Sequence, residues 1–392
     1  MASISAEMKK QLVREGIRGS GFEPKYNEMT LQTQNGSGQW ENAYDSILHT
    51  NLADIASPRY IDDMVLVMGW ENKFHPIKTW IDNQRMNHTW DGVDYIHRLA
   101  QYFENPDGMF EIYLRKWMIG AIDRIYNGGT RNPILVLDGE QESGKSSFVK
   151  WLCPKPFRDQ YFMEGQVRPD DKDHRLALLR NFIWEIGEID ATTKRADASA
   201  LKDFLTISKV KERGAYDKRL TEHPTVCSFI GTFNNVAGFL TDPTGSSRFR
   251  VCKITKINWL GYSTDPDDLS ALSWAQAIAL WDSGETNELS REDKVKMERI
   301  NSQYTLDNNT RFALEEYFVI TPGSDDFTSS NYIREVLQDH GLRGADIDSR
   351  RVAACLLEAG CRKAQKKTNG VNRKGWFGIS KRLDAEIEHD KR

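Results

Sequence analysis

The segment LVLDGEQESGKSSFVKWL, from Leu135 to Leu152, constrains the fold more than any other part of the chain. It begins as an apolar strand, passes through a polar loop with two glycines, and continues as a helix. The loop fits the pattern G-x-x-x-x-G-K-[ST], in which the backbone turns tightly and its N–H groups point at a phosphate. Strand, loop and helix in this order predict a P-loop at the start of an α/β domain.

Each residue of the loop has an expected part in nucleotide binding. Gly139 and Gly144 permit the tight turn, and Lys145 reaches the β- and γ-phosphates. The hydroxyl of Ser146 binds Mg²⁺, and Ser147 follows it in the first turn of the helix. The expected ligands are therefore ATP and Mg²⁺.

Two acidic residues, Glu140 and Glu142, stand in the loop where a triphosphate would bind. Backbone N–H groups and Lys145 make the phosphate contacts, so we expect both carboxylates to point into solvent. Their cost is then long-range repulsion, which salt screens. We therefore expect a working nucleotide site, and whether its affinity is weakened is left open.

A second buried strand, about 40 residues after the loop, is expected within NFIWEIGEID. Glu185 and Glu188 follow its apolar run. One carboxylate, Glu185, is expected to hold Mg²⁺, and the other to orient the attacking water. The alternative, two surface acids at the end of a strand, remains open.

Two further motifs follow in order. In SFIGTFNN, a strand places Asn234 near the γ-phosphate, where an amide positions water without competing for the metal. In DPTGSSRF, Arg248 stands between a turn and a strand, where a guanidinium could reach across a subunit boundary. Such an arginine stabilises the transferred phosphoryl group by about 4 to 7 kcal/mol. The alternatives are a simple turn residue for Asn234 and a surface pair with Asp242 for Arg248.

The composition limits the class of protein. The net charge is −4, so any DNA contact must come from local basic patches. The five cysteines are scattered and form no C-x-x-C pair, which favours a reducing compartment and argues against a zinc ribbon. The N-terminus lacks the apolar core of a signal peptide, and no apolar run approaches 18 residues. We expect a soluble, cytoplasmic protein with no membrane partner.

The length of 392 residues suggests two or three domains. We expect a mostly helical accessory or oligomerisation region over residues 1–113, a P-loop ATPase domain over 114–300 and a C-terminal domain over 301–392. In that last part, two short helices precede RKAQKKTNGVNRKGWFGI, which is typical of a hairpin with a basic tip. Helix, helix and hairpin are the order of a winged helix-turn-helix.

Two parts of the chain are candidates for contact with DNA. The first lies between the second and third motifs, where basic residues bind phosphate and a tyrosine stacks on a base: Lys209, Lys211, Arg213, Tyr216, Lys218 and Arg219. The second is the C-terminal module, since residues 341–392 hold 13 Lys/Arg against 7 Asp/Glu. A solvated charged hairpin and a protein-binding module, respectively, remain the alternatives.

The motifs in this order resemble superfamily 3 helicases and the related poxvirus primase-helicase group, and most of all the virulence-associated protein E family of phages, prophages and phage satellites. The resemblance covers roughly residues 74–281. It is carried by FHPIKTWI, TWDGVDYIHRLAQYF, LVLDGEQESGKSS, FIWEIGEID, SFIGTFNN and DPTGSSRF. Two departures stand out: the family usually has glycine at Glu142 and an arginine pair at Ser247-Arg248. Arg250 is the candidate for the missing partner.

The resemblance implies an α/β P-loop ATPase core of the AAA+-like, superfamily 3 helicase type, with a helical N-terminal region and a C-terminal winged helix. It implies a hexameric ring that moves on single-stranded or forked DNA in a bacterial host cell. In such rings, the loop before the third strand projects into the central channel. A primase or origin-binding protein would act in trans. Two other classes are weighed: a regulatory ATPase that remodels an origin without processive unwinding, and a small-molecule P-loop kinase, which the Asn234 and Arg248 motifs disfavour.

Overall fold

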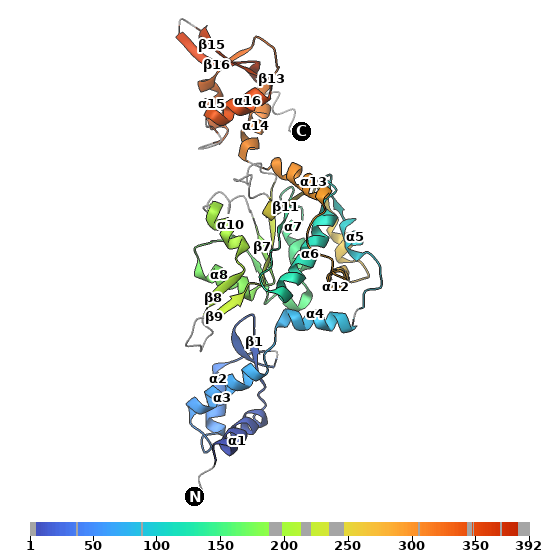
Figure 1. Cartoon of the computed structure of the whole chain (residues 1–392), viewed down its shortest axis with the longest axis vertical. Helices are drawn as coiled ribbons and strands as arrows, with labels where there is room; N and C mark the ends of the chain where they lie inside the picture. The colour runs from blue at the N-terminus through green and yellow to red at the C-terminus, as the bar shows by residue number, and fades with distance from the viewer. Residues whose placement is uncertain are drawn as a thin grey trace.

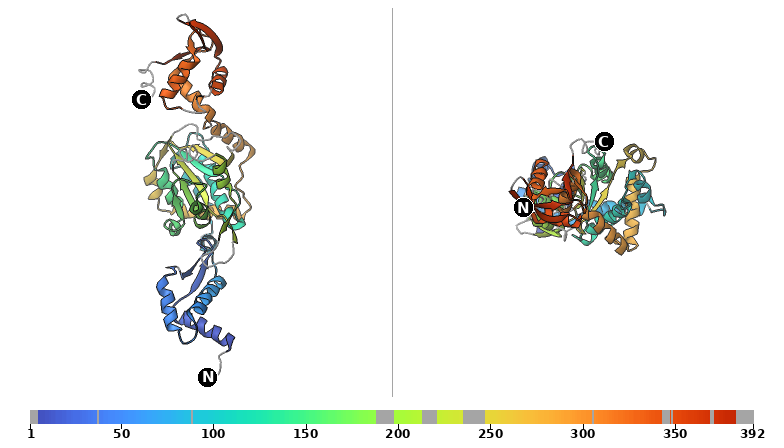
Figure 2. Two further views of the ribbon diagram at one scale, coloured as in Figure 1. Left: turned by 90° about the vertical axis from the view of Figure 1, so that its left-hand side faces the viewer. Right: turned by 90° about the horizontal axis from the view of Figure 1, so that it is seen from above.

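A computed structural model of the chain describes residues 5–36, 38–87, 89–187, 198–212, 221–234, 247–304, 306–342, 347, 349–368 and 371–382. The molecule is elongated, and three units follow one another along its long axis, with the N-terminus at one end (Figures 1 and 2). Among the described residues, no helix is long and apolar enough to cross a membrane. All five cysteines are buried.

The N-terminal unit packs three helices against a small antiparallel sheet. The helices are α1 (Ala6–Gly19), α2 (Asn42–Asn51) and α3 (Pro58–Glu71), and the strands are β1 (Pro24–Asn27), β2 (Gln32–Asn35) and β3 (Gly38–Gln39). The unit has a hydrophobic core of its own, which includes Val13, Leu48, Ile61 and Met68. Helix α3 buries apolar residues at helical spacing, among them Ile61, Met64, Val65 and Met68.

The central unit is built on a sheet of five parallel strands in the order β11-β5-β10-β7-β6. The strands are β5 (Ile134–Asp138), β6 (Phe162–Glu164), β7 (Ile183–Ile186), β10 (Ser228–Phe233) and β11 (Phe249–Lys253). Every residue of β5, β7 and β10 is buried, as expected where helices cover both faces of a parallel sheet. The predicted α/β fold with a parallel sheet is confirmed.

Helices cover this sheet and complete its core. They are α4 (Pro76–Asn87), α5 (Tyr95–Ala100), α6 (Phe110–Asn127), α7 (Lys145–Leu152), α8 (Lys172–Arg180), α10 (Ala198–Thr206), α11 (Trp259–Ser263), α12 (Leu269–Asp282) and α13 (Arg291–Ser302), with a 3₁₀ turn at Lys155–Phe157. Strands β4 (Phe103–Glu104) and β12 (Lys256–Ile257) form a separate pair. One hydrophobic core includes residues from Tyr26 to Tyr304. Helices α4 and α5 belong to it and pack with the sheet, although they precede residue 114, where the ATPase domain was expected to begin.

The strand order fixes where a ligand meets the sheet. Strand β5 lies between β10 and β11, and the chain leaves it toward β6 on one side and returns to β11 on the other. In an open parallel sheet, ligands bind beyond the carboxyl ends of the strands at such a switch point. The P-loop follows β5 at this place.

A two-stranded hairpin precedes β10. It consists of β8 (Lys209–Glu212) and β9 (Thr221–Pro224), and its base is held by Arg124, which is 2% exposed. The guanidinium donates to the carbonyl of Ile207 at 2.9 Å and to Oγ1 of Thr225 at 2.6 Å, on the two sides of the hairpin. The hairpin therefore starts from a fixed base at the amino edge of the sheet.

The C-terminal unit has a third core, which includes Leu314, Ile333, Leu356 and Trp376. Its helices are α14 (Leu306–Tyr317), α15 (Ser330–Asp339) and α16 (Ser349–Glu358), and its strands are β13 (Phe318–Ile320), β14 (Phe327–Ser329), β15 (Arg362–Thr368), β16 (Val371–Phe377) and β17 (Ile379–Lys381). The expected order of helix, helix and hairpin is present as α15, α16 and β15–β16. Its assignment as a winged helix stays a prediction.

Candidate nucleotide site

The P-loop joins β5 to α7, and its two glycines are required for different reasons. Gly144 stands directly before α7 with φ +92°, a conformation that other residues rarely adopt. Gly139 is required for space, because an added Cβ would lie 2.3 Å from the backbone oxygen of Ile254. The sequence pattern and the local geometry agree on this loop.

Lys145 opens α7 and is 5% exposed. Its ammonium donates to the carbonyl oxygens of Gly139, at 2.9 Å, and of Glu140, and more weakly to Oγ of Ser143 at 3.2 Å. Burial lowers the pKa of Lys145 below the usual lysine range, and the negative charges of Asp138, Glu140 and Glu185 oppose that shift. The N–H groups of the Lys145 ammonium thus donate to loop oxygens, and phosphate oxygens of a bound nucleotide could take the place of these acceptors.

Glu185 lies in β7 with 1% of its surface exposed, which excludes the alternative of a surface acid. Its Oε1 accepts a hydrogen bond of 3.0 Å from Oγ1 of Thr232 in the neighbouring strand. Its Oε2 is buried and accepts no hydrogen bond. Burial raises the pKa of Glu185 above the usual glutamate range, while the nearby hydroxyls of Ser146 and Thr232 act against that rise.

Asn234 follows β10 and reaches the P-loop. Its Oδ1 accepts a hydrogen bond of 3.3 Å from Nζ of Lys145. Because β10 pairs with both β5 and β7, Asn234 stands between the P-loop and the strand of Glu185. The structure therefore brings Lys145, Glu185 and Asn234 together from three separate motifs.

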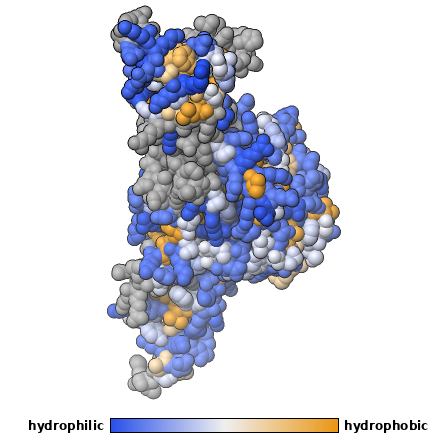
Figure 3. Space-filling view, turned by 45° about the horizontal axis from the view of Figure 1, so that its top comes forward, coloured by the Kyte–Doolittle hydropathy of each residue, from blue (hydrophilic) through white to orange (hydrophobic). Residues whose placement is uncertain are grey.

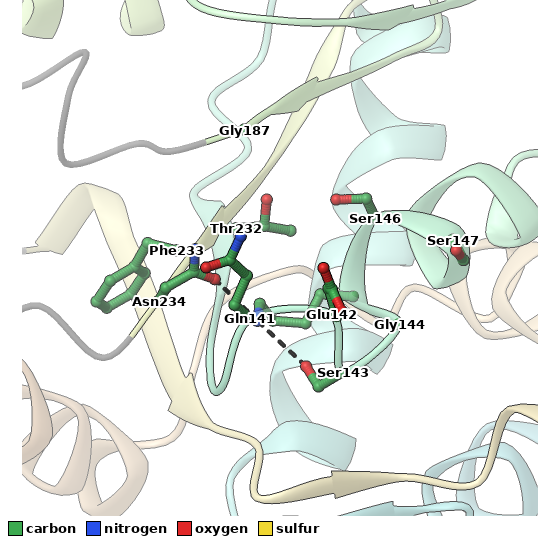
Figure 4. A pocket seen from close by; sticks show the side chains of 11 residues that line it. Gln141, Glu142, Ser143, Gly144, Ser146, Ser147, Gly187, Thr232, Phe233 and Asn234 are labelled. Carbon is green, nitrogen blue, oxygen red and sulfur yellow. Dashed lines mark hydrogen bonds between the residues drawn. The ribbon is translucent and has the colours of Figure 1, made fainter.

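A pocket of about 290 Å³ lies over the loop (Figure 4). It is lined by Gln141, Glu142, Ser143, Gly144, Lys145, Ser146, Ser147, Gly187, Thr232, Phe233 and Asn234. Ser146 and Ser147 are exposed on its helix side. All of the predicted nucleotide-binding residues except Gly139 line this pocket.

Glu140 and Glu142 are both exposed, but they differ in their relation to the pocket. Glu140 is exposed and does not line the pocket, but Glu142 does, and Figure 4 shows its carboxylate on the side of Thr232 and Ser146. Glu142 also has φ +60°, in the left-handed region that favours glycine. The resemblance described in the sequence analysis leads one to expect glycine at this position, and this backbone angle gives a physical reason for that expectation.

The residues fit a Mg²⁺ ion. The buried Oε2 of Glu185 lacks a donor, and a carboxylate oxygen in that state suits a hard cation. Ser146 lines the nucleotide pocket, and Glu185 is hydrogen-bonded to Thr232, which also lines it. Among the described residues no cluster of three or more His, Cys, Asp or Glu could bind a metal by itself, so phosphate and water would have to supply the other ligands. Glu188, the predicted partner carboxylate, lies outside the described residues.

Arg248 lies at the opposite edge of the sheet from its own P-loop. Strand β11 pairs with β5 in parallel, with Phe249 beside Ile134 and Lys253 beside Asp138. Arg248 comes before the first of these pairs, and the P-loop follows the last. The strand has five residues, and its four steps of about 3.3 Å separate the two edges by about 13 Å. Asp242, its alternative partner, lies outside the described residues.

A second arginine adjoins Arg248. Nη2 of Arg131 donates to Oγ of Ser247 at 3.2 Å, so its guanidinium lies beside the position of the missing arginine. Burial lowers the pKa of Arg131, and the positive charge of Arg248 lowers it further. Arg250, the expected substitute, is 3% exposed and donates to the carbonyl of Asn287, so its guanidinium is buried within its own subunit.

The hairpin β8–β9 carries two of the six predicted DNA-binding residues. Lys209 and Lys211 are both exposed, and Glu222 in the opposite strand lies 3.9 Å and 3.2 Å from their ammonium groups. The other four residues lie outside the described residues: Arg213, Tyr216, Lys218 and Arg219.

Sequence reasoning missed Thr232 and Arg131. Thr232 carried a usable signal, because it stands two residues before Asn234 at the end of the same strand. The sequence around Arg131 gives no such signal, because the closeness of Arg131 to Ser247 depends on the pairing of β11 with β5.

Comparison with known proteins identifies the family of the chain. A family model, the virulence-associated protein E-like domain, matches residues 84–306, more than half of the chain and all five strands of the parallel sheet. The A form apo structure of the NrS-1 C-terminal region is 14% identical over 74% of this chain and 76% of that chain, with a TM-score of 0.38. The apo structure of its residues 305–718 gives the same values, and a likeness at this level bears on no residue of the site. No curated protein matches the sequence.

Proposed function

This chain belongs to the virulence-associated protein E-like family, and we propose that it is an ATP-hydrolysing, ring-forming DNA helicase for the replication of a phage or mobile genetic element. The observation that carries the proposal is the meeting of Lys145, Glu185 and Asn234 at the carboxyl edge of one parallel sheet. A phosphate-binding lysine, a buried carboxylate and an amide are the groups that phosphoryl transfer to water requires.

Each of these groups has a task that its surroundings favour. Lys145 exchanges the carbonyl oxygens of Gly139 and Glu140 for phosphate oxygens of ATP. Ser146 and Glu185 would hold Mg²⁺, which supplies positive charge against the phosphate oxygens. Asn234 orients the attacking water, and Glu188 is the proposed residue that accepts its proton. Thr232 fixes the carboxylate of Glu185 by its hydrogen bond of 3.0 Å.

The position of Arg248 supports a ring. An arginine at the amino edge of the sheet cannot reach the P-loop of its own chain, which follows the carboxyl edge. It can serve only the nucleotide of a neighbouring subunit, and a head-to-tail contact of that kind closes into a ring when the rotation permits. We propose a homo-hexamer in which Arg248 and Arg131 face the neighbour's phosphates.

The hairpin β8–β9 is the proposed contact with single-stranded or forked DNA inside the ring. Lys209 and Lys211 lie in one strand, and the remaining predicted basic residues come between the two strands in the sequence. Basic side chains bind the phosphate backbone whatever the sequence, as a translocating element must. A primase or an origin-binding protein would be a separate chain.

The first experiment compares ATP hydrolysis and unwinding of a labelled forked duplex in the presence of Mg²⁺. Lys145→Met removes the phosphate-binding ammonium, and Lys150→Met, an exposed lysine of the same helix, is the matched control. We expect Lys145→Met to lose both activities and Lys150→Met to keep them. Hydrolysis that survives in Lys145→Met would overturn the nucleotide site.

One observation favours a second function, an ATPase that remodels a replication origin without processive unwinding. Glu222 pairs with both hairpin lysines of the described strands, which weakens the grip on a phosphate backbone. That reading predicts DNA-stimulated hydrolysis without strand separation in the same assay. Glu188→Gln distinguishes both functions from a contaminating ATPase, because it should abolish hydrolysis in either case.

A further inference from the structure

The C-terminal sheet has one face that its core does not cover. Strands β14, β16 and β15 lie side by side, and paired residues share a face: Phe327 with Phe377 and Arg362, and Thr328 with Trp376 and Lys363. Trp376 is 2% exposed and belongs to the C-terminal core, so Thr328 and Trp376 mark the inner face. Phe327 and Phe377 belong to no core cluster and are half-buried. They mark the outer face.

The two rings on the outer face are held in place. Their centroids lie 5.4 Å apart at an interplanar angle of 62°. Gly375 lies beneath Phe327, since an added Cβ would come within 2.6 Å of its Cζ and 2.3 Å of the Thr328 oxygen. A fixed, half-exposed aromatic pair loses little conformational entropy when a flat ligand stacks on it.

Basic side chains surround this pair. The register places three of them on the outer face: Arg362, Lys366 and Arg373. Nζ of Lys366 lies 5.9 Å from the ring centre of Phe327 and 5.6 Å from that of Phe377, and the guanidinium of Arg362 lies 5.9 Å from that of Phe377. The nearby acid Asp325 is 98% exposed and 3.9 Å from Arg362, so it neutralises little of this charge.

We propose that this outer face binds single-stranded nucleic acid, with bases stacked on Phe327 and Phe377 and phosphates held by Arg362, Lys366 and Arg373. Fixed aromatic rings beside basic side chains are how proteins bind single strands without sequence preference. Figure 3 shows apolar surface bordered by hydrophilic surface on this unit. The site is separate from the nucleotide pocket and from the hairpin β8–β9, and it stands whether or not the chain hydrolyses ATP.

The ring pair favours a single strand over a duplex. In a duplex the bases are stacked on each other, and only the phosphates of the backbone would meet this face. A single strand offers free base faces as well, so the aromatic pair contributes only to that ligand. DNA and RNA share this chemistry, and the site as described contains no group that reads the 2′-hydroxyl.

The test measures fluorescence anisotropy of labelled oligodeoxythymidine, oligouridine and a DNA duplex with the full chain and no nucleotide. Phe327→Leu with Phe377→Leu keeps apolar side chains and removes both rings. We expect single-strand affinity to fall about tenfold for each ring, and duplex affinity to stay unchanged. Unchanged binding of both single strands would overturn the proposal, as would an equal loss for the duplex. Loss for oligouridine alone or oligodeoxythymidine alone would identify which nucleic acid the face takes.

Charge variants remain decisive if the double leucine variant fails to fold. Lys366→Gln removes one outer-face charge, and Lys374→Gln removes one charge from the same hairpin on the inner-face side, opposite Gln365. Lys366→Gln should reduce the slope of log affinity against log salt by about 0.7 for a single strand, and Lys374→Gln should leave it unchanged. Equal slopes for the two variants would show that general charge, and not this face, binds the strand.

Discussion

The hydroxyl of Tyr304 donates a hydrogen bond of 2.8 Å to Oδ2 of Asp138, the residue that ends β5 before the P-loop. The ring of Tyr304 also packs edge-on against Phe233 at 5.6 Å, next to Asn234. Three residues earlier, Nδ2 of Asn301 donates to the carbonyl of Phe249 in β11. The end of α13 and Tyr304, which lead to the C-terminal unit, are therefore attached to two strands. One is β5, which the P-loop follows, and the other is β11, which begins directly after Arg248.

Tyr304→Phe should destabilise the central unit. The change removes a buried hydrogen bond to a carboxylate, for which the loss is about 1.5–3 kcal/mol. Denaturant unfolding followed by tryptophan fluorescence measures it, since Trp117, Trp184 and Trp274 are fully buried in this unit. Tyr332→Phe, at a tyrosine that is 41% exposed, is the control and should leave the midpoint unchanged. Equal midpoints for the two variants would contradict the contribution of the Tyr304 hydroxyl.

Glu142→Gly should strengthen nucleotide binding and also stabilise the fold, for two separable reasons. The change removes a carboxylate from the phosphate pocket. It also places glycine, which adopts a φ of +60° without strain, at a position that has this angle. Each effect is of the order of 1 kcal/mol, the first by Coulomb repulsion and the second by relief of the left-handed conformation. Isothermal titration with ATP and Mg²⁺ measures the affinity.

Glu142→Gln separates these effects, because it removes the charge and keeps the strained backbone. We expect it to gain affinity but no stability, whereas Glu142→Gly gains in both, less the entropy that glycine adds to the unfolded chain. Glu140→Gln is the charge control outside the pocket. An affinity gain as large for Glu140→Gln would show that distance from the phosphates does not matter.

Glu185→Gln should stabilise the free protein while it abolishes hydrolysis. Burial raises the folded-state pKa of Glu185 above its ordinary value of 4.5, so the ionised form costs folding free energy at neutral pH. That cost is present above the folded pKa and disappears as pH falls below the unfolded value. Glutamine avoids it, for a gain of the order of 1 kcal/mol. Thermal unfolding without nucleotide should show a larger gain at pH 8 than at pH 5, and a gain that grows toward pH 5 would contradict the direction of the pKa shift.

The parallel sheet and the P-loop could be predicted from the sequence because local patterns specify them. Apolar runs such as ILVL, and the spacing of Gly139, Gly144 and Lys145, need no distant partner to be recognised. Lys145 and Asn234 could be assigned to one site because parallel strands end at one edge of the sheet.

The remainder depended on tertiary contacts. Glu142 has a positive φ and lines the pocket, and a glutamate at this position in the sequence does not predict either feature. The burial of Arg250 beside Asn287 depends on tertiary contacts. The closeness of Arg131 to Ser247 depends on the pairing of β11 with β5. The packing of α4 and α5 with the sheet depends on a core that residues far apart in the chain complete.

Arg131→Ala and Arg248→Ala should each reduce hydrolysis and leave ATP binding intact. Both residues lie at the edge remote from their own pocket, so the loss should appear only in the assembled protein. Removal of an arginine that stabilises the transferred group costs 10³-fold or more in turnover, and Arg131 should contribute about tenfold as the second charge. Arg180→Ala, at an exposed arginine ending α8, is the control.

Mixing experiments show on which subunit these arginines act. Arg248→Ala subunits keep an intact pocket, and Lys145→Met subunits keep an intact arginine edge. Mixed in equal amounts, the two inactive variants should recover part of the hydrolysis, since some interfaces combine one good pocket with one good edge. No recovery would contradict action on a neighbour.

Glu222 should restrain the hairpin's hold on DNA. It lies 3.2 Å from Lys211 and 3.9 Å from Lys209, and both ion pairs are exposed, so their loss costs the fold little. Glu222→Gln frees two ammonium groups for phosphate and should lower the DNA concentration at half-maximal ATPase stimulation severalfold, more at low salt than at high salt. Lys211→Ala should raise it, and Lys211→Ala with Arg213→Ala should abolish stimulation with basal hydrolysis unchanged. Glu104→Gln, which releases the exposed Lys256 in the same way but away from the hairpin, should leave stimulation at the wild-type level. If Glu104→Gln changed the stimulation as much as Glu222→Gln, the net charge of the protein would account for the effect. That result would contradict the assignment of the hairpin as the DNA contact.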